Sequence, residues 1–127
     1  MNVVVDSSIW IDYFRGGKYS RELDLLIDEN LIYTNDLILA ELIPPLAIKK
    51  EKRLVNLLYE LAKVELDIDW SRIVKYQITC LSSGINRVGI PDLIILDNVI
   101  KNDLILFTKD KHFELIREYI EFEMWGD

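Results

Sequence analysis

Carboxylates that follow short apolar runs are the residues of this chain best suited to chemistry. Asp6 comes directly after the β-branched run at 3–5, and Asp110 lies two residues beyond the apolar run at 104–108. Asp92 stands at the expected start of a helix, where the positive end of the helix dipole favours a negative charge. Each of the three could also serve only as a helix cap, and that simpler interpretation stays open.

Glu41 is a fourth candidate, because it interrupts an otherwise apolar stretch, LILAELI at 37–43. An unpaired carboxylate in apolar surroundings is strongly destabilising. We therefore expect Glu41 to be buried and to have a partner. A structural ion pair with a lysine is the alternative to a functional site.

Four carboxylates in one place would repel one another unless a cation neutralised them. Hard divalent ions such as Mg²⁺ and Mn²⁺ prefer oxygen ligands. Such an ion lowers the pKa of a bound water and holds the oxygens of a phosphodiester. Together, Asp6, Glu41, Asp92 and Asp110 predict a metal site for phosphodiester chemistry. Asp97 is excluded, because it lies about 140° around the helix from Asp92.

Short strands that alternate with helices would bring these acids together. Apolar runs at 3–5, 31–34, 64–66 and 104–108 are typical of strands buried on both faces of a parallel sheet, and 120–125 alternates like a half-exposed edge strand. Helical periodicity fills the intervals. We expect breaks at Gly16-Gly17 and in a loop at 84–89, and at Pro44-Pro45, where a short helix at 36–43 would end. These patterns predict a parallel α/β sheet, in which ligands lie beyond the carboxyl ends of the strands.

Composition bounds the kind of protein. The chain has 127 residues, of which half are hydrophobic, so we expect one ordered domain over residues 1–127. One cysteine, Cys80, and one histidine, His112, exclude a disulfide scaffold and a Cys/His zinc cluster. With no apolar stretch long enough to span a membrane and no signal-peptide pattern, we expect a cytoplasmic protein.

The charge balance restricts nucleic-acid binding. Fifteen basic residues stand against 22 acidic ones, which gives a net charge of -7. A general polyanion binder needs the opposite balance, because lysine and arginine supply nonspecific affinity for phosphates. Any role with nucleic acid must therefore depend on bound cations or on a local basic patch, for which the loop residues are candidates: Arg15, Lys18, Arg87, Lys109 and Lys111.

Four segments resemble the PIN domain, specifically the small single-domain PIN ribonucleases that serve as VapC toxins of toxin–antitoxin pairs. The resemblance spans almost the whole chain, and these segments carry it: VVVDSSIWIDYF at 3–14, LILAELI at 37–43, GIPDLIILDNVI at 89–100 and LILFTKDKHFELI at 104–116. Each motif alone is weak, but all four occur in the family's order in a chain of the family's length.

The resemblance implies a three-layer α/β/α fold with a central parallel sheet of about five strands. It also implies endonucleolytic hydrolysis of RNA with Mg²⁺ or Mn²⁺, leaving a 5′-phosphate and a 3′-hydroxyl, and a homodimer bound by a small antitoxin. Asp6, Glu41, Asp92 and Asp110 match the family's acidic positions. Ser7 and Thr108 match polar positions that support the acids.

Several residues and alternatives stay open at this point. The family chemistry requires no histidine, so we expect His112 to have a surface or packing role. Aromatic residues of the first helix, Trp10, Tyr13 and Phe14, could form a partner surface or pack in the core. Response-regulator, haloacid-dehalogenase and phosphate-loop patterns fail on spacing. The remaining alternative is a catalytically inactive PIN-like scaffold that binds RNA or protein.

Overall fold

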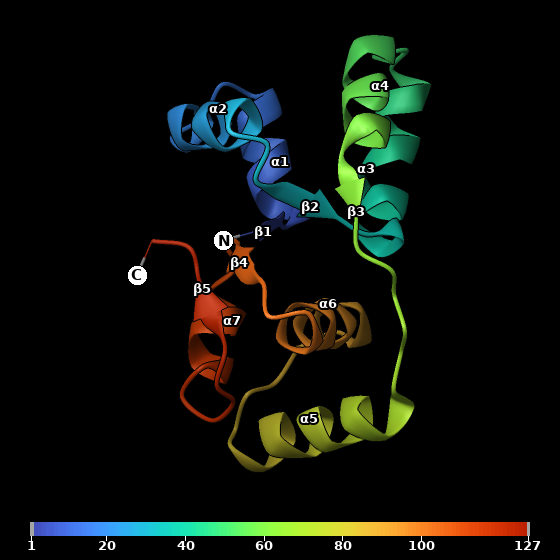
Figure 1. Cartoon of the computed structure of the whole chain (residues 1–127). Helices are drawn as coiled ribbons and strands as arrows, with labels where there is room; N and C mark the ends of the chain where they lie inside the picture. Colours follow the sequence, from blue (N-terminus) through green and yellow to red (C-terminus); the bar gives the residue numbers. More distant parts are fainter. Residues whose placement is uncertain (1, 127) are drawn as a thin grey trace.

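A five-stranded parallel sheet runs through the middle of the computed structural model, which describes residues 2–126 (Figure 1). The strand order is β3-β2-β1-β4-β5, and every neighbouring pair is parallel. The strands are short: β1 Val3–Val5, β2 Ile32–Thr34, β3 Ala62–Lys63, β4 Ile105–Phe107 and β5 Glu123–Met124. The expected α/β class with a parallel sheet of about five strands is confirmed.

Helices cover both faces of the sheet, which gives the three layers. Helices α1 to α4 lie on the upper side in Figure 1, and α5 to α7 lie on the lower side, with α6 between α5 and the sheet. Their bounds are α1 Ser7–Phe14, α2 Ser20–Asp28, α3 Asp36–Ile48, α4 Lys52–Glu60, α5 Trp70–Ser82, α6 Ile90–Lys101 and α7 Lys111–Ile116. No helix within residues 2–126 is long and apolar enough to cross a membrane.

Helix α3 corrects one expectation. The helix was expected to end before Pro44-Pro45, but it continues through both prolines to Ile48. Both prolines are exposed, so their rings meet solvent rather than neighbouring helices. A proline cannot donate a backbone hydrogen bond, so the carbonyls of Ala40 and Glu41 lack their usual intrahelical donors. Packing of α3 against α4 and α1 outweighs this loss.

Strand β3 corrects a second expectation, since it occupies 62–63 rather than 64–66. The reason lies in its neighbour β2, which ends at Thr34 before α3 begins. The backbone N–H of Val64 donates to the Thr34 carbonyl at 2.8 Å, the last point where β2 offers an acceptor. Residues beyond Val64 therefore have no strand to pair with. The expected edge strand at 120–125 is real but shorter, at 123–124.

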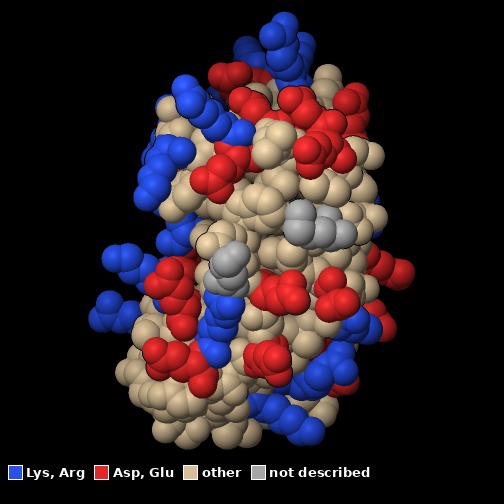
Figure 2. All heavy atoms as spheres, turned by 60° about the vertical axis from the view of Figure 1, so that its left-hand side comes forward, with Lys and Arg blue, Asp and Glu red and all other residues tan. Residues whose placement is uncertain are grey.

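The core lies between the sheet and the inner faces of the helices. Val3, Val4 and Val5 are fully buried, as expected for a central strand. Trp10 is also fully buried, which decides its role in favour of core packing, whereas Tyr13 and Phe14 are only half-buried beside it. On the surface, acidic and basic side chains are interspersed, and uncharged residues dominate the lower end of the view, where α5 lies (Figure 2).

Candidate functional site

Asp6 sits at the carboxyl end of β1 and is held there by the neighbouring strand. Its backbone N–H donates to the carbonyl of Phe107 in β4 at 2.9 Å. Its carboxylate accepts hydrogen bonds from the Ser7 backbone N–H at 2.8 Å, the Ser8 hydroxyl at 3.0 Å and the Thr108 hydroxyl at 2.8 Å. The side chain is buried and caps α1. The cap and the position at the sheet edge are therefore two properties of one residue.

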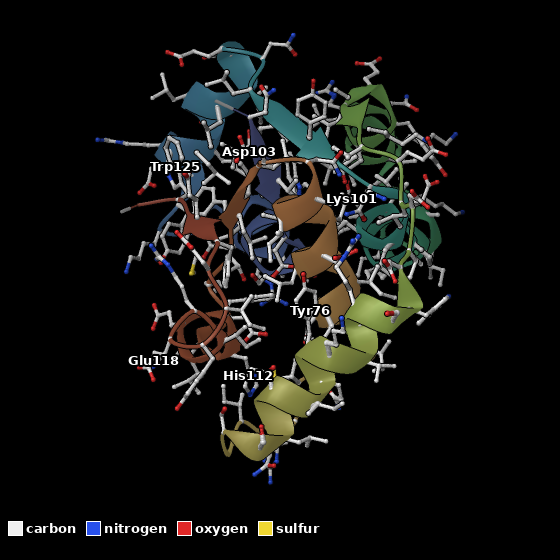
Figure 3. The ribbon with its side chains drawn as sticks, turned by 60° about the horizontal axis from the view of Figure 1, so that its bottom comes forward. Tyr76, Lys101, Asp103, His112, Glu118 and Trp125 are labelled. Atoms are coloured by element: carbon white, nitrogen blue, oxygen red, sulfur yellow. The ribbon has the colours of Figure 1, made fainter. Side chains whose placement is uncertain are left out.

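Asp110 is joined to Asp6 through Thr108. The Thr108 hydroxyl donates to Asp6 and accepts from the Asp110 backbone N–H at 3.1 Å. The Asp110 carboxylate caps α7 by accepting from the His112 backbone N–H at 2.9 Å, and the His112 ring nitrogen Nδ1 lies 2.9 Å from the same oxygen. His112 thus has a carboxylate partner at the start of α7 (Figure 3), a contact that the sequence did not reveal.

Asp92 occupies the third position of α6 and faces back toward the loop before it. The backbone N–H of Gly89, the residue that caps α6, donates to its carboxylate. Partial burial raises the pKa of Asp92, and the negative charges of Asp110 and Asp6 raise it further, whereas the Gly89 hydrogen bond opposes the shift. Asp92 is therefore within electrostatic reach of both acids on the neighbouring strands.

Glu41 departs from the sequence expectation. It is exposed on α3, because the buried face of this helix is formed by Ile38, Leu39 and Leu42. It therefore needs no lysine partner. Part of the side chain nevertheless loses water, and this desolvation raises the pKa of Glu41, followed by the negative charges of Asp6 and Asp92.

The structure thus brings all four acids within electrostatic reach of one another at the carboxyl edge of the sheet. They do not converge closely: within residues 2–126, no three Asp, Glu, His or Cys side chains are arranged as a metal-binding group. The donor set fits a hard divalent cation, since it consists of carboxylate oxygens whose mutual repulsion such a cation would relieve. To coordinate one ion directly, the carboxylates would have to move closer together.

Two asparagines that the sequence reading missed connect the helices carrying Glu41 and Asp92. Asn35 follows β2, is buried, and caps α3 by accepting from the Ile38 N–H at 2.9 Å. Its side-chain amide donates to Asn98 of α6 at 3.1 Å. The signal was present, because Asn35 follows a strand just as Asp6 does, but a search for charged groups passes over an amide.

Asp97 was correctly separated from the acidic edge. It is buried and bound by Arg72 of α5, with its carboxylate 2.7 Å from the Arg72 Nε atom, and it also accepts from the Tyr76 hydroxyl at 3.3 Å. Figure 3 shows Tyr76 between α5 and α6. These contacts hold α5 onto α6 rather than serving chemistry.

An apolar groove of about 300 Å³ opens beside Glu41. It is formed by α1, α3 and the start of α4, and its lining includes Ile11, Phe14, Leu46 and Lys49. A larger cavity of about 610 Å³ lies elsewhere, between the end of α6 and residues 117–123, and contains none of the four acids. The smaller groove is therefore the one relevant to the acidic edge.

A lysine from the loop after β4 contacts the loop after α1. The Lys109 ammonium lies 3.6 Å from the Asp12 carboxylate, which also accepts from the Tyr19 backbone N–H at 3.1 Å. Gly17 passes so close to Asp12 that a Cβ there would meet its carboxylate at 2.3 Å. The close approach explains why this turn needs glycine, and it places a basic group next to Ser8 and Thr108.

Solved structures of similar fold cover the chain almost completely. VapBC2 from Rickettsia felis, bound to a DNA fragment from its promoter, gives a TM-score of 0.75 at 21% identity, with 99% of this chain and 100% of that chain covered. DNA-bound VapBC from Salmonella typhimurium gives 0.75 at 19% identity, covering 98% of both chains. FitAcB from Neisseria gonorrhoeae gives 0.72 at 16% identity, covering 98% of this chain and 96% of that one.

Sequence comparison gives the family. No curated protein matches the chain. The PIN domain family model matches residues 3–119, a span that includes Asp6, Glu41, Asp92 and Asp110. Since the match covers nearly the whole chain and agrees with the fold, this protein belongs to the PIN domain family.

Proposed function

We propose that this chain, one PIN-like domain over residues 1–127, is a Mg²⁺- or Mn²⁺-dependent endoribonuclease and the toxin of a toxin–antitoxin pair. One observation carries the proposal: four acids from β1, α3, α6 and α7 meet at the carboxyl edge of the sheet and raise the pKa of Glu41 and Asp92. A cluster whose members repel one another costs stability. A divalent cation gives it a purpose.

The metal would be held by Asp6, Glu41, Asp92 and Asp110, and it would supply an activated water and charge neutralisation at the phosphate. Asp6 is the most firmly positioned of the four, because three hydrogen-bond donors fix its carboxylate. Glu41 is the most adjustable, because its long side chain is exposed. We therefore expect Asp6 to set the place of the ion and Glu41 to close around it.

RNA is the substrate that the charge distribution accommodates. The chain carries a net charge of -7, so it cannot hold a polyanion by its overall field. Lys109 and Lys111 flank Asp110 and are the basic residues next to the acidic edge. They would contact phosphates on either side of the cleaved bond, while the metal bridges the acids to the phosphate itself.

A small antitoxin would bind across the groove beside Glu41. The solved relatives from Rickettsia felis and Salmonella typhimurium are VapBC complexes, and the groove is apolar with Glu41 at its edge. A helix or extended segment that fills it with apolar side chains could place an arginine among the carboxylates. Ile11 is 43% exposed in this groove, so Ile11→Glu should fold and lose the antitoxin.

That partner is tested by purifying the chain expressed from its native operon. The wild type should bring down one small protein encoded beside it, and Ile11→Glu should not. Tyr59→Glu, a change at another exposed position outside the groove, should behave like the wild type. Recovery of the wild type without any small operon-encoded protein would count against the antitoxin.

A catalytically inactive scaffold is the second candidate, and the absence of a tightly arranged metal-binding group within residues 2–126 is the observation that favours it. The two functions differ in a direct assay. Wild type, Asp6→Asn and Asp92→Asn are incubated with RNA and Mn²⁺, with Asp28→Asn as an exposed control on α2. A nuclease is cut off by the first two changes, by about a hundredfold or more, and not by the control. Equal activity in all four proteins, or none in any, would reject the nuclease.

A further inference from the structure

Helix α5 presents an apolar stripe to solvent. Trp70, Val74, Ile78 and Leu81 are 58%, 56%, 60% and 57% exposed, and their spacing places them on one side of the helix. The opposite side, with Ile73 and Cys80, is buried against α6. Within residues 2–126, no other element covers the stripe. Elsewhere the exposed large apolar residues stand singly, as Ile48 and Tyr59 do, whereas here four lie in a row.

The stripe matches itself when one copy is reversed. Successive members are four, four and three residues apart, so an antiparallel second copy places Trp70 opposite Leu81 and Val74 opposite Ile78. The row spans about 16 Å, since each residue rises 1.5 Å along the helix. An interface between identical chains related by a two-fold axis requires this kind of self-complementary pattern.

Charge also favours a second copy on this face. Two chains that each carry a net charge of -7 repel one another wherever their acids meet. Helix α5 carries none of the 22 acidic residues, and the flank of the stripe consists of Ser71, Lys75 and Ser82. The lower end of the molecule in Figure 2, where α5 lies, accordingly shows mainly uncharged surface. The acid-free face lets two copies approach with little repulsion.

We propose that two copies of this chain associate through the α5 stripe, packed antiparallel about a two-fold axis. The proposal deepens the homodimer expected for the proposed toxin by assigning its surface. A stable dimer buries about 800 Å² on each partner, so the four side chains form its centre and residues 83–90 join the rim. That segment leads from α5 to Asp92, so the dimer places the acidic edges of both copies beside its border.

The first experiment measures mass in solution by light scattering on the full chain. The wild type should show about twice the 14.9 kDa of one chain. Ile78→Glu should show the mass of one chain at the same concentration, with a dissociation constant at least about tenfold higher. Ile48→Glu, an equally exposed apolar position on α3, should keep the wild-type mass. Circular dichroism checks that both variants fold.

Two results would overturn the proposal. A wild type with the mass of one chain at high concentration would remove the dimer altogether, and a dimeric Ile78→Glu would place it on another surface. Neither result bears on RNA cleavage, so the nuclease assay stands or fails separately.

A cross-linking experiment tests the antiparallel arrangement. Chains with Ser71→Cys mixed with chains with Ser82→Cys should be joined by a short bis-maleimide, because these positions face each other across the axis. Each variant alone should not react between copies, since its two thiols lie roughly 14 Å apart. Cys80 is buried and does not compete. Cross-linking within either single variant, or none in the mixture, would exclude the antiparallel pairing.

Discussion

Tyr13 shows how a single hydrogen bond changes the chemistry of one residue. Its hydroxyl donates to the Asp24 carboxylate at 2.6 Å, which ties α1 to α2. This bond, together with burial and the charge of Asp24, raises the pKa of Tyr13 to about 12. Because the folded-state pKa exceeds the unfolded value near 10, the bond stabilises the fold fully below pH 10 and is lost as the pH rises through about 12.

We predict that an ultraviolet titration will detect this shift. One of the six tyrosines should ionise near pH 12 in the wild type, and Asp24→Asn should move that ionisation to lower pH. Tyr76, whose pKa is raised by burial and by Asp97, provides an internal reference that the substitution leaves unchanged. A titration curve unaffected by Asp24→Asn would show that the contact does not form in solution.

Glu41 offers a second test at the scale of one side chain. We predict that Glu41→Gln raises the melting temperature of the metal-free protein by up to about 3 °C, because it removes repulsion from Asp6 and Asp92. Glu121→Gln, at an exposed position away from the four acids, should leave the melting temperature unchanged. A fall in melting temperature for Glu41→Gln alone would mean that Glu41 has a stabilising partner instead.

At the scale of elements, α5 depends on α6 for its position. Arg72 binds Asp97 with side chains that are 38% and 4% exposed, so loss of the arginine would leave a buried charge poorly compensated. We predict that Arg72→Met lowers the free energy of unfolding by about 2 kcal/mol, less than for a fully buried pair because Arg72 is partly hydrated and Tyr76 remains.

Urea denaturation measures this change. The midpoint should fall while the slope stays constant, which is the mark of lost stability rather than of a less compact state. Lys63→Met is the matched control, because Lys63 pairs with Asp36 where both side chains are well exposed, at 53% and 75%. Equal losses in the two variants would show that burial of Asp97 is not the cause.

The elements also show how far the sequence could be read. Short apolar runs located the central strands because every side chain of a buried parallel strand avoids water. The position of β3 could not be found this way, because the end of β2 decides it. The continuation of α3 through Pro44-Pro45 was missed for a similar reason, since contacts with other helices outweigh local propensity.

For the candidate site, strand ends identified Asp6 and Asp110 because topology fixes which ends meet. Glu41 was chosen for burial that it does not have, yet it lies within reach of Asp6. Its helix is apolar nearly all round, so the sequence could not say which face is covered. Contacts between distant segments, such as Asn35 with Asn98, could not be predicted from the residues alone.

At the scale of the whole molecule, a bound cation should couple the acidic edge to global stability. We predict that Mn²⁺ at a hundredfold excess over its dissociation constant stabilises the wild type by about 2.7 kcal/mol. Asp92→Asn should show a smaller gain, and Asp28→Asn the full gain. Thermal melts with and without Mn²⁺ measure the effect without any RNA. Equal gains in all three proteins would place the ion elsewhere.

The link from Thr108 to Asp6 has a consequence for synthesis of the chain. The two residues are 102 positions apart, so their hydrogen bond forms only after almost the entire polypeptide has left the ribosome. Domains emerge from the N-terminus onward, and a long-range strand pairing must wait for its second partner. If the acidic edge cuts RNA, a nascent chain therefore carries its first carboxylate harmlessly past the ribosomal RNA and becomes a nuclease only on release.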